Sequence, residues 1–235
     1  CKLVVHLTVY GACFLCWRVV SWDVGIGYAI LGSMTMQPSY PIITPFEAVP
    51  TAIDGLYIIT MKQVTDERGT VRELFRQSAM DSTPLPQFGP WKQINATQTN
   101  RGSIRGLHAE AMNKLVAVVA GEAFGVYVDA RIDSPTVGAV VTVPLTKGVQ
   151  VFVPQGVCNG FQSTSEQPSQ YLYCFDEEWQ PGMPGISLTP LDPELDIDWP
   201  IPIDTSTYDQ VSKKDGNAPT LRSVIGDDAM AQRTH

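Results

Sequence analysis

Turn-forming residues recur roughly every eight to twelve residues along most of this chain, and this spacing limits the possible folds more than any other feature. Between the turns lie short segments in which apolar and polar residues alternate, for example 115–119 and 123–130, which flank Gly121. Alternation with a period of two is typical of β-strands. Further strands are predicted at 56–63, 70–76, 91–97, 137–145, 150–154 and 170–175, with a hairpin turn at 66–69. Because no long amphipathic helix interrupts the series, the pattern predicts an all-β sandwich or barrel.

Three segments depart from this pattern of strands and turns. Prolines within residues 36–50 predict an extended segment that pairs as an edge strand. Prolines also punctuate residues 77–90, where we expect a loop. A helical pattern is confined to residues 221–230 and predicts a short helical tail at the C-terminus.

The beginning of the chain differs from the rest in composition. Residues 1–35 are apolar and aromatic, but His6, Arg18 and Asp23 interrupt them. No apolar run therefore reaches the roughly 20 residues that a membrane-spanning helix needs. We interpret this segment as a leader, natural or added upstream, that is not part of the fold; a membrane anchor is the alternative. Residues 36–235 are then expected to form a single domain.

Charge and cysteine content narrow the classes of partner. The formal net charge is −8, which argues against nucleic acid, because binding to nucleic acid depends on neutralising phosphates with Lys and Arg. A small anionic ligand stays possible, since a few arginines in one pocket suffice to bind it. Three of the five cysteines lie in the first sixteen residues, so the rest of the chain has no disulfide framework. This favours a reducing, cytoplasmic environment.

The segment 105–108, Arg-Gly-Leu-His, is the strongest candidate for chemistry. Two of the three histidines, His6 and His235, lie near the chain ends, which leaves His108 as the imidazole available to the fold. Arg105 and Lys114 place cations on either side of it. An imidazole beside two cations suits removal of a proton next to a carbonyl, with the cations stabilising the negative charge that develops. The alternative is a purely structural histidine. A metal site is not expected, because one internal histidine without His-x-His supplies too few ligands.

Other polar and aromatic residues allow two interpretations each. Tyr171, Tyr173 and Phe175 alternate on one predicted strand and so share a face, either as core or as a source of a phenolic proton. Asp215, in the sequence Ser-Lys-Lys-Asp at 212–215, is either a turn residue or the carboxylate that orients His108. The arginines Arg68, Arg76 and Arg105, with Gln93 and Asn95, are either surface residues or the lining of a diphosphate pocket.

With these residues in view, the chain resembles the dTDP-4-dehydrorhamnose 3,5-epimerase family over roughly residues 58–221. The landmarks are DERGTVRELF (66–75), KQINATQTNRGSIRGLH (92–108), KLVAVVAGEAFGVYVDAR (114–131), DSPTVG (133–138), VPQGVCNGF (153–161), LYCFDEEWQP (172–181), LDPELDIDWP (191–200) and SKKDGNAPTL (212–221). The resemblance implies a cupin-like jelly roll (a double-stranded β-helix) with a short helical C-terminal tail. It also implies activity on a nucleotide-linked 4-keto-6-deoxy sugar.

The resemblance implies a role for each residue of a candidate site. His108 matches the general base that removes the proton alpha to the C4 ketone, and Asp215 matches its paired carboxylate. Lys114 matches the lysine that stabilises the enolate oxygen, with Arg105 beside it, and Tyr173 matches the tyrosine that returns a proton from the opposite face. The residues expected to hold the nucleotide diphosphate, partly across a homodimer interface, are Arg68, Glu73, Gln93 and Asn95. No cofactor or metal and no membrane or nucleic-acid partner is implied; the expected ligand is a dTDP-4-keto-6-deoxyhexose.

Four departures from the family pattern leave the outcome of the reaction open. Asn159 stands where the family usually has a histidine near the base, and Gly125 where it usually has an aspartate. The loop from His108 to Lys114 is shorter than usual, and Trp179 replaces a frequent tyrosine. Inversion at C3, at C5 or at both stays open. The alternatives are a ketoisomerase, which generally needs a second histidine, and a nucleotide-sugar-binding protein without turnover.

Overall fold

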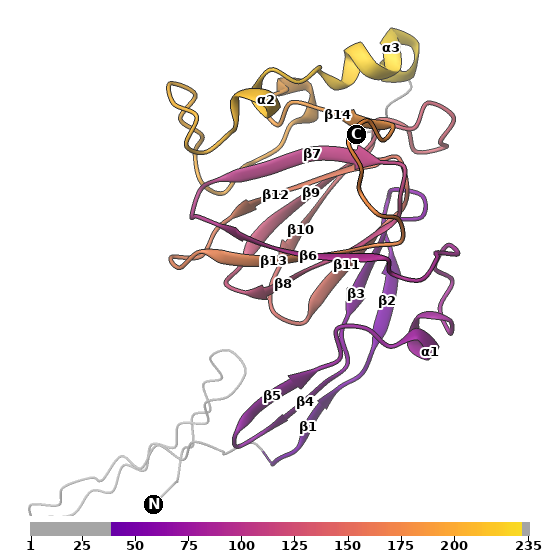
Figure 1. The fold of residues 1–235 in the computed structure, drawn as a ribbon, viewed down its shortest axis with the longest axis vertical. Helices are drawn as coiled ribbons and strands as arrows, with labels where there is room; N and C mark the ends of the chain where they lie inside the picture. The colour runs from indigo at the N-terminus through magenta and orange to yellow at the C-terminus, as the bar shows by residue number, and fades with distance from the viewer. Residues whose placement is uncertain (1–38, 232–235) are drawn as a thin grey trace, which may run out of the picture.

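The computed structural model describes residues 39–231, so the predicted leader at 1–35 lies outside the described residues. Fourteen strands of this part of the chain form three antiparallel sheets. Figure 1 shows the two larger sheets as the layers of a sandwich, with the smallest sheet projecting from one end. The prediction of an all-β jelly roll is confirmed, and the helical tail is present as well.

The largest sheet has six strands and forms one wall of the sandwich. In spatial order these are β2 (Glu47–Pro50), β3 (Tyr57–Thr60), β11 (Val149–Val153), β8 (Lys114–Ala120), β13 (Ser169–Phe175) and β6 (Gln93–Thr99). β2 is an edge strand, as its prolines predicted. Its outer face is covered by apolar side chains such as Phe88 and Trp91, which pack against buried Leu115 and Phe152. The central strands are therefore buried on both faces, and the first five residues of β8 are all buried.

The second wall has five strands and carries His108. In spatial order these are β10 (Val140–Leu145), β9 (Ala123–Asp129), β12 (Val157–Ser163), β7 (Ile104–Glu110) and β14 (Gly185–Ser187). Its outer face is covered by the C-terminal segments, including the 3₁₀ turn η1 (Pro193–Leu195) and the helix α3 (Leu221–Ala231), as Figure 1 shows. Leu195, Leu221 and Ile225 pack there against Leu107 and Val126.

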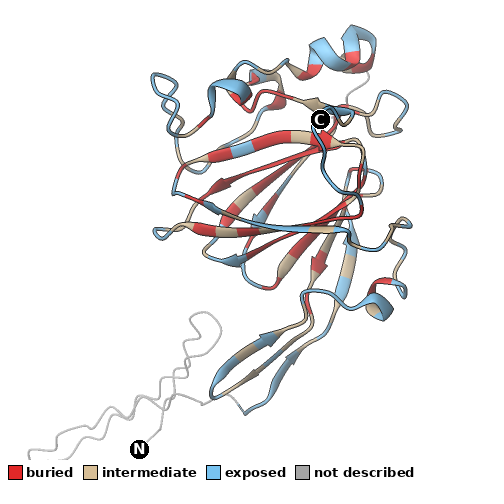
Figure 2. Ribbon diagram, viewed as in Figure 1, coloured by how far each residue is buried: buried red, intermediate tan, exposed pale blue. Residues whose placement is uncertain are grey.

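The smallest sheet, which we call the arm, contains β1 (Ile42–Thr44), β4 (Gln63–Asp66) and β5 (Gly69–Arg72). Figure 2 shows that it is exposed over much of its length. The sequence predicted one strand over 56–63, and this was wrong. The chain leaves the six-stranded sheet after Thr60 and enters the arm at Gln63, because β3 pairs with β2 and β11 whereas β4 pairs with β1 and β5. The predicted hairpin of β4 and β5 is confirmed.

Helices are short in the described part of the chain. The segment 77–90, predicted as a loop, contains the one-turn helix α1 (Gln77–Met80), which is too short to give a periodic signal. A second one-turn helix, α2 (Lys213–Gly216), holds Asp215. The predicted helix at 221–230 is α3, although Gly226 interrupts it with a φ of 83°.

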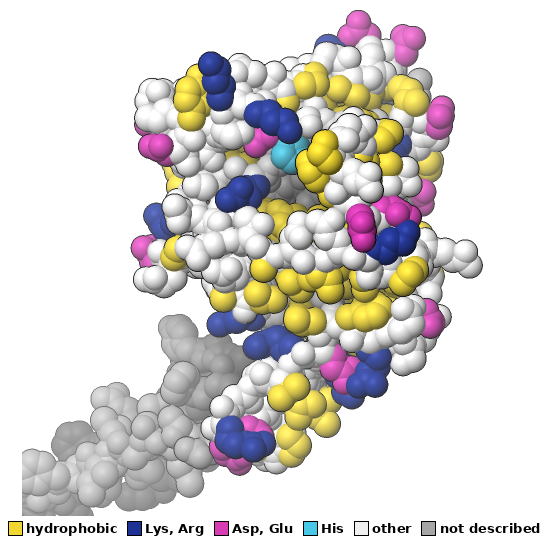
Figure 3. Space-filling view, in the orientation of Figure 1, with side chains coloured by type: hydrophobic (Ala, Val, Ile, Leu, Met, Phe, Trp, Pro, Cys, Tyr) yellow, Lys and Arg dark blue, Asp and Glu magenta, His cyan; other side chains and the backbone are white. Residues whose placement is uncertain are grey.

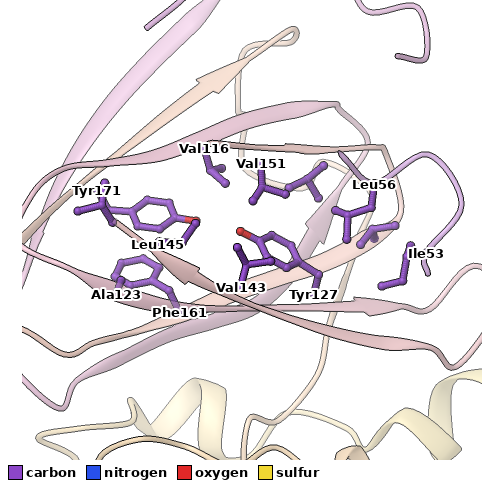
Figure 4. Packing of buried hydrophobic residues seen from close by; sticks show 13 residues of the cluster. Ile53, Leu56, Val116, Ala123, Tyr127, Val143, Leu145, Val151, Phe161 and Tyr171 are labelled. Carbon is purple, nitrogen blue, oxygen red and sulfur yellow. The ribbon is translucent and has the colours of Figure 1, made fainter. Parts of the chain in front are cut away.

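The main core fills the space between the two large sheets. Its members come from both walls, for example Val116 and Val151 from one and Val143 and Phe161 from the other. Each aliphatic side chain of this kind contributes about 1.5–3 kcal/mol when it is fully buried. Phe161 stacks on Tyr171 with ring centroids 3.9 Å apart. Figure 4 shows these side chains meeting between the sheets, with Tyr127 and Tyr171 pointing their hydroxyls toward one another.

Candidate active site

Strands of both walls deliver the candidate residues to one place. β7 and β12 pair so that Asn159 lies directly beside His108. In the opposite wall, Tyr173 of β13 pairs with Asn95 of β6, and Lys114 begins β8 next to the end of β13. Because the two walls face each other, side chains from four segments distant in the sequence converge between them.

A cavity of about 180 Å³ opens at this point of convergence. Its lining is formed by Asn95, Arg105, Gly106, His108, Glu110, Lys114, Asn159, Tyr173 and Phe175. A second cavity of about 470 Å³ shares Arg105, His108 and Tyr173 with the first and extends to Tyr208 and Gln210. Figure 3 shows a histidine side chain beside Lys or Arg side chains at a hollow in this face of the molecule. The two joined cavities suit a ligand with a sugar-sized end and an extended polar remainder.

His108 and Asp215 form a hydrogen-bonded pair. The distance from His108 Nε2 to Asp215 Oδ1 is 2.7 Å. Ser212 caps helix α2 by accepting a hydrogen bond from the backbone N–H of Asp215 at 3.0 Å, and this fixes where the carboxylate begins. Burial by itself raises the pKa of Asp215, but the hydrogen bond and the charge of His108 lower it more, so the net pKa lies below its ordinary value. The carboxylate therefore stays ionised and orients the imidazole.

Lys114 is nearly buried, yet its charge is compensated. Its ammonium donates to Asn159 Oδ1 at 2.7 Å and to the backbone carbonyl of His108 at 3.1 Å. It also forms an ion pair with Glu110, with Nζ and Oε2 2.5 Å apart. The side chain of Lys114 is only 5% exposed, so the cation faces the cavity rather than bulk water. This places a fixed positive charge next to His108.

Tyr173 and Arg105 complete the polar lining. Burial raises the pKa of the Tyr173 phenol above its ordinary value, although the nearby charge of Arg105 lowers it in part. The phenol is thus kept in the protonated form, which can donate a proton. Arg105 donates from Nε to Thr99 Oγ1 at 2.8 Å, which holds its guanidinium along the shared edge of the two cavities. Tyr171, two residues earlier on the same strand, belongs to the core instead.

The motif at 105–108 has a local structural reason. A Cβ atom at Gly106 would lie 2.5 Å from Gly160 Cα and 2.8 Å from the carbonyl oxygen of Asn159. Gly106 also has a φ of 122°, which side chains rarely allow. The register of β7 against β12 shifts at this point, as in a β-bulge. Three residues of β7, from Arg105 to His108, therefore span two of β12, and both side chains reach the same cavity.

Not every predicted nucleotide-binding residue reaches this cavity. Asn95 lines it, and Gln93 lies two residues away, donating from Nε2 to Asn95 Oδ1 at 3.1 Å. Arg68 lies in the turn between β4 and β5, where its side chain is 89% exposed and pairs with Asp66. Glu73 follows β5 and pairs with Arg76. Neither Arg68 nor Glu73 lines the two joined cavities of its own chain.

The structure explains the departure at Gly125. A Cβ atom there would lie 3.0 Å from the hydroxyl oxygen of Tyr127 and 2.9 Å from Leu145 Cδ1. The phenol of Tyr127, which is fully buried, thus occupies the space that a side chain at position 125 would need. Position 125 therefore offers no polar group to the site. At position 159 the polar role is retained, because the Asn159 side chain accepts a hydrogen bond from Lys114.

Sequence reasoning missed Glu110, although a signal was present. Glu110 lies two residues after His108 on β7, and alternation in a strand places both side chains on one face. Both line the cavity.

Other features of the surface do not compete with this site. A larger cavity, of about 770 Å³, lies between residues 132–137 and α3, but its lining contains three aspartates and no cationic side chain, which is unsuitable for an anionic ligand. Within residues 39–231 no group of three or more His, Cys, Asp and Glu side chains is arranged to hold a metal ion. In the same range, no helix has the length and apolar character required to cross a membrane.

Comparison with known proteins places this geometry in a family. The family model described as dTDP-4-dehydrorhamnose 3,5-epimerase matches residues 50–223. A protein of that name from Methanothermobacter thermautotrophicus is 32% identical over 185 residues, which cover 75% of this chain and 95% of the relative. This chain belongs to the dTDP-4-dehydrorhamnose 3,5-epimerase family.

Two further members of the family differ in what their names and titles state. A dTDP-4-dehydro-6-deoxyglucose 3-epimerase from Streptomyces bikiniensis is 31% identical over 74% of this chain and 89% of its own length. The crystal structure of a 3,5-epimerase from Legionella pneumophila, in complex with dTDP-4-keto-L-rhamnose, is 33% identical. It covers 81% of this chain and 100% of its own, with a TM-score of 0.68. The family thus contains both 3,5-epimerases and 3-epimerases.

Proposed function

We propose that this protein is an epimerase that inverts C3, C5 or both centres of a dTDP-4-keto-6-deoxyhexose. The observation that carries the proposal is the convergence of the His108–Asp215 pair, Lys114 and Tyr173 on one cavity. A base, a fixed cation and a protonated phenol in one site are the groups that enolisation and reprotonation require. The ligand of the Legionella pneumophila relative and the names of the other relatives support this substrate class.

In the proposed reaction His108 removes the proton alpha to the C4 ketone. The electron pair of the broken C–H bond forms the carbon–carbon double bond of an enolate, and the carbonyl electrons move to the oxygen. Lys114 and Arg105 stabilise the resulting negative charge, and Asp215 stabilises the imidazolium. Tyr173 then delivers a proton to the carbon from the opposite face, which inverts the centre. The raised pKa of the Tyr173 phenol supports this assignment, since it keeps the proton available.

The nucleotide diphosphate is proposed to lie along Gln93 and Asn95 in one subunit and to meet Arg68 and Glu73 of a second copy. Support for a homodimer comes from the arm, where the register aligns Ile43, Val64 and Val71 in one row across three strands. These side chains are 61%, 36% and 73% exposed. An apolar row of this kind on a projecting sheet favours pairing with another chain.

We also propose that the protein is cytoplasmic and that residues 36–235 form its one domain. The two cysteines of the described region, Cys158 and Cys174, are buried free thiols, which suits a reducing compartment.

The proposal is tested by proton NMR of the protein with dTDP-4-keto-6-deoxyglucose in deuterium oxide. Loss of the C3 or C5 proton signal is expected, because each enolisation exchanges the proton for deuterium. Exchange at both centres would identify a 3,5-epimerase, and exchange at one would identify a single-centre enzyme. If neither centre exchanges while the nucleotide still binds, the protein is a nucleotide-sugar-binding protein and the proposed function is wrong.

A further inference from the structure

The ammonium of Lys114 lies against three oxygen atoms of its own chain. They are the side-chain oxygen of Asn159 at 2.7 Å, the backbone carbonyl of His108 at 3.1 Å and the Oε2 atom of Glu110 at 2.5 Å. A lysine ammonium carries three N–H groups, so the three acceptors match its donors. The orientation of this cation is therefore set by the residues around it.

Glu110 differs from the other two acceptors in charge and in place. The carbonyl of His108 belongs to the backbone of β7, and Asn159 is buried on β12. Both are neutral and held by the sheet. Glu110 is the last residue of β7, four positions before Lys114, and its carboxylate supplies the negative charge of an ion pair with a cation that is 5% exposed. A bond between charged partners is about twice as strong as a neutral one, so this contact holds Lys114 most firmly.

Glu110 also lies within reach of the proposed acid. Tyr173 lines the same cavity. Burial is the largest cause of the raised pKa of Tyr173 and Arg105 opposes it, but the Glu110 carboxylate adds to the rise. One side chain thus acts electrostatically on the cation and on the phenol.

We propose that Glu110 is a positioning residue of the epimerase reaction, which holds the charged Lys114 ammonium so that it faces the ketone oxygen of the substrate. The inference rests on the proposed function. Glu110 exchanges no proton with the substrate; it acts through Lys114. Its removal is therefore expected to slow enolisation without weakening the nucleotide end of the binding site, where Gln93 and Asn95 lie.

The test is a double-mutant cycle on the rate of deuterium incorporation at saturating substrate. The variants are Glu110→Ala, Glu110→Gln, Lys114→Met and the double variant Glu110→Ala/Lys114→Met. Glu166→Ala, at an 85% exposed glutamate on the surface, is the matched control. Glu110→Ala is expected to slow exchange about 10- to 100-fold. Glu110→Gln, which keeps an oxygen acceptor of similar reach, should lose less, and the affinity for dTDP should stay within about twofold of wild type.

The decisive result is non-additivity. In the Lys114→Met background, Glu110→Ala should cost less than about twofold, because the residue through which Glu110 acts is gone. Equal losses in both backgrounds, or wild-type exchange in Glu110→Ala, would overturn the inference and leave the proposed function intact. If wild type itself exchanges neither proton, the proposed function fails and this inference fails with it. Should Glu110→Ala not fold, the cycle is run with Glu110→Gln, which preserves the size of the side chain.

Discussion

His108 and Asp215 lie 107 positions apart in the chain and meet at a hydrogen-bond distance of 2.7 Å. The imidazole alone has two ring nitrogens of similar basicity, and the carboxylate decides which of them carries the proton. Nε2 faces Asp215, so the other nitrogen, Nδ1, is the one left to accept a proton from the substrate. A single side-chain pair thus turns an ordinary histidine into an oriented base.

Replacing His108 by alanine should reduce deuterium exchange at C3 and C5 by about 10²–10⁴-fold, the usual contribution of a positioned base. Binding of dTDP should be almost unchanged, because the nucleotide end of the proposed site is formed by other residues. The measurements are the NMR exchange rate and calorimetric titration with dTDP. An active His108→Ala variant would contradict the assignment of the base.

Asp215→Asn should destabilise the protein at neutral pH but not in acid. The pKa of Asp215 is lower in the folded chain than its ordinary value. Such a group adds to stability above its unfolded pKa of about 3.9, and the contribution disappears as the pH falls through the lower folded pKa. The difference in melting temperature between wild type and variant should therefore be present at about pH 7 and narrow below about pH 4. A difference that stays constant down to acid would show that the pair with His108 adds no charge-dependent stability.

At the scale of single elements, the irregularity of β7 decides how the site is assembled. In a regular strand Arg105 and His108, three positions apart, would point to opposite faces. The register shift between β7 and β12 adds one residue to β7, and both side chains then line one cavity. The shift coincides with the close approach of Gly106 to Gly160, where no side chain fits. The glycine in the motif is thus needed for the geometry of the arginine and the histidine.

Gly106→Ala should lower both stability and activity. The added Cβ would lie 2.5 Å from the backbone of Gly160, so β7 and β12 must separate, at a cost of roughly 1–3 kcal/mol for the strained backbone and the displaced strand. Gly182→Ala is the matched control, because Gly182 also has a positive φ but has no atom within 4 Å of the added Cβ. Thermal unfolding and exchange rates measure the difference. Equal melting temperatures for the two variants would contradict the close-approach explanation.

At the scale of the whole molecule, the arm is the part that a single chain leaves unpacked. The core between the large sheets is closed, and the outer faces of both are covered by chain segments. The row of Ile43, Val64 and Val71 is exposed instead, and Arg68 lies at the turn of the same sheet. Arg68 and Glu73 would reach a nucleotide only if the arm met a second subunit. The completeness of the proposed site is therefore tied to the oligomeric state.

Val71→Asp is expected to convert the proposed dimer into a monomer, because a charge would replace an apolar side chain at the centre of the interface. Ile132→Asp, at a 58% exposed apolar residue away from the arm, should remain dimeric. Light scattering after size-exclusion chromatography gives the mass, and titration with dTDP should show weaker binding for the Val71→Asp variant only. A monomeric wild type would contradict the dimer and the assignment of Arg68.

The sequence by itself determined the strand-rich architecture, the helical tail and the identities of the residues that line the cavity, including His108, Lys114 and Tyr173. Alternation and turn residues encode strands locally, and the ordered motifs of a family carry its site with them. The split of 56–63 into two strands was not predictable, because both parts have β-forming residues and only pairing with different neighbours separates them. The bulge in β7, the ion pair of Glu110 with Lys114 and the filling of the space beside Gly125 by Tyr127 are likewise tertiary. Each depends on how closely two backbones or side chains approach, and that distance is set by packing rather than by local sequence.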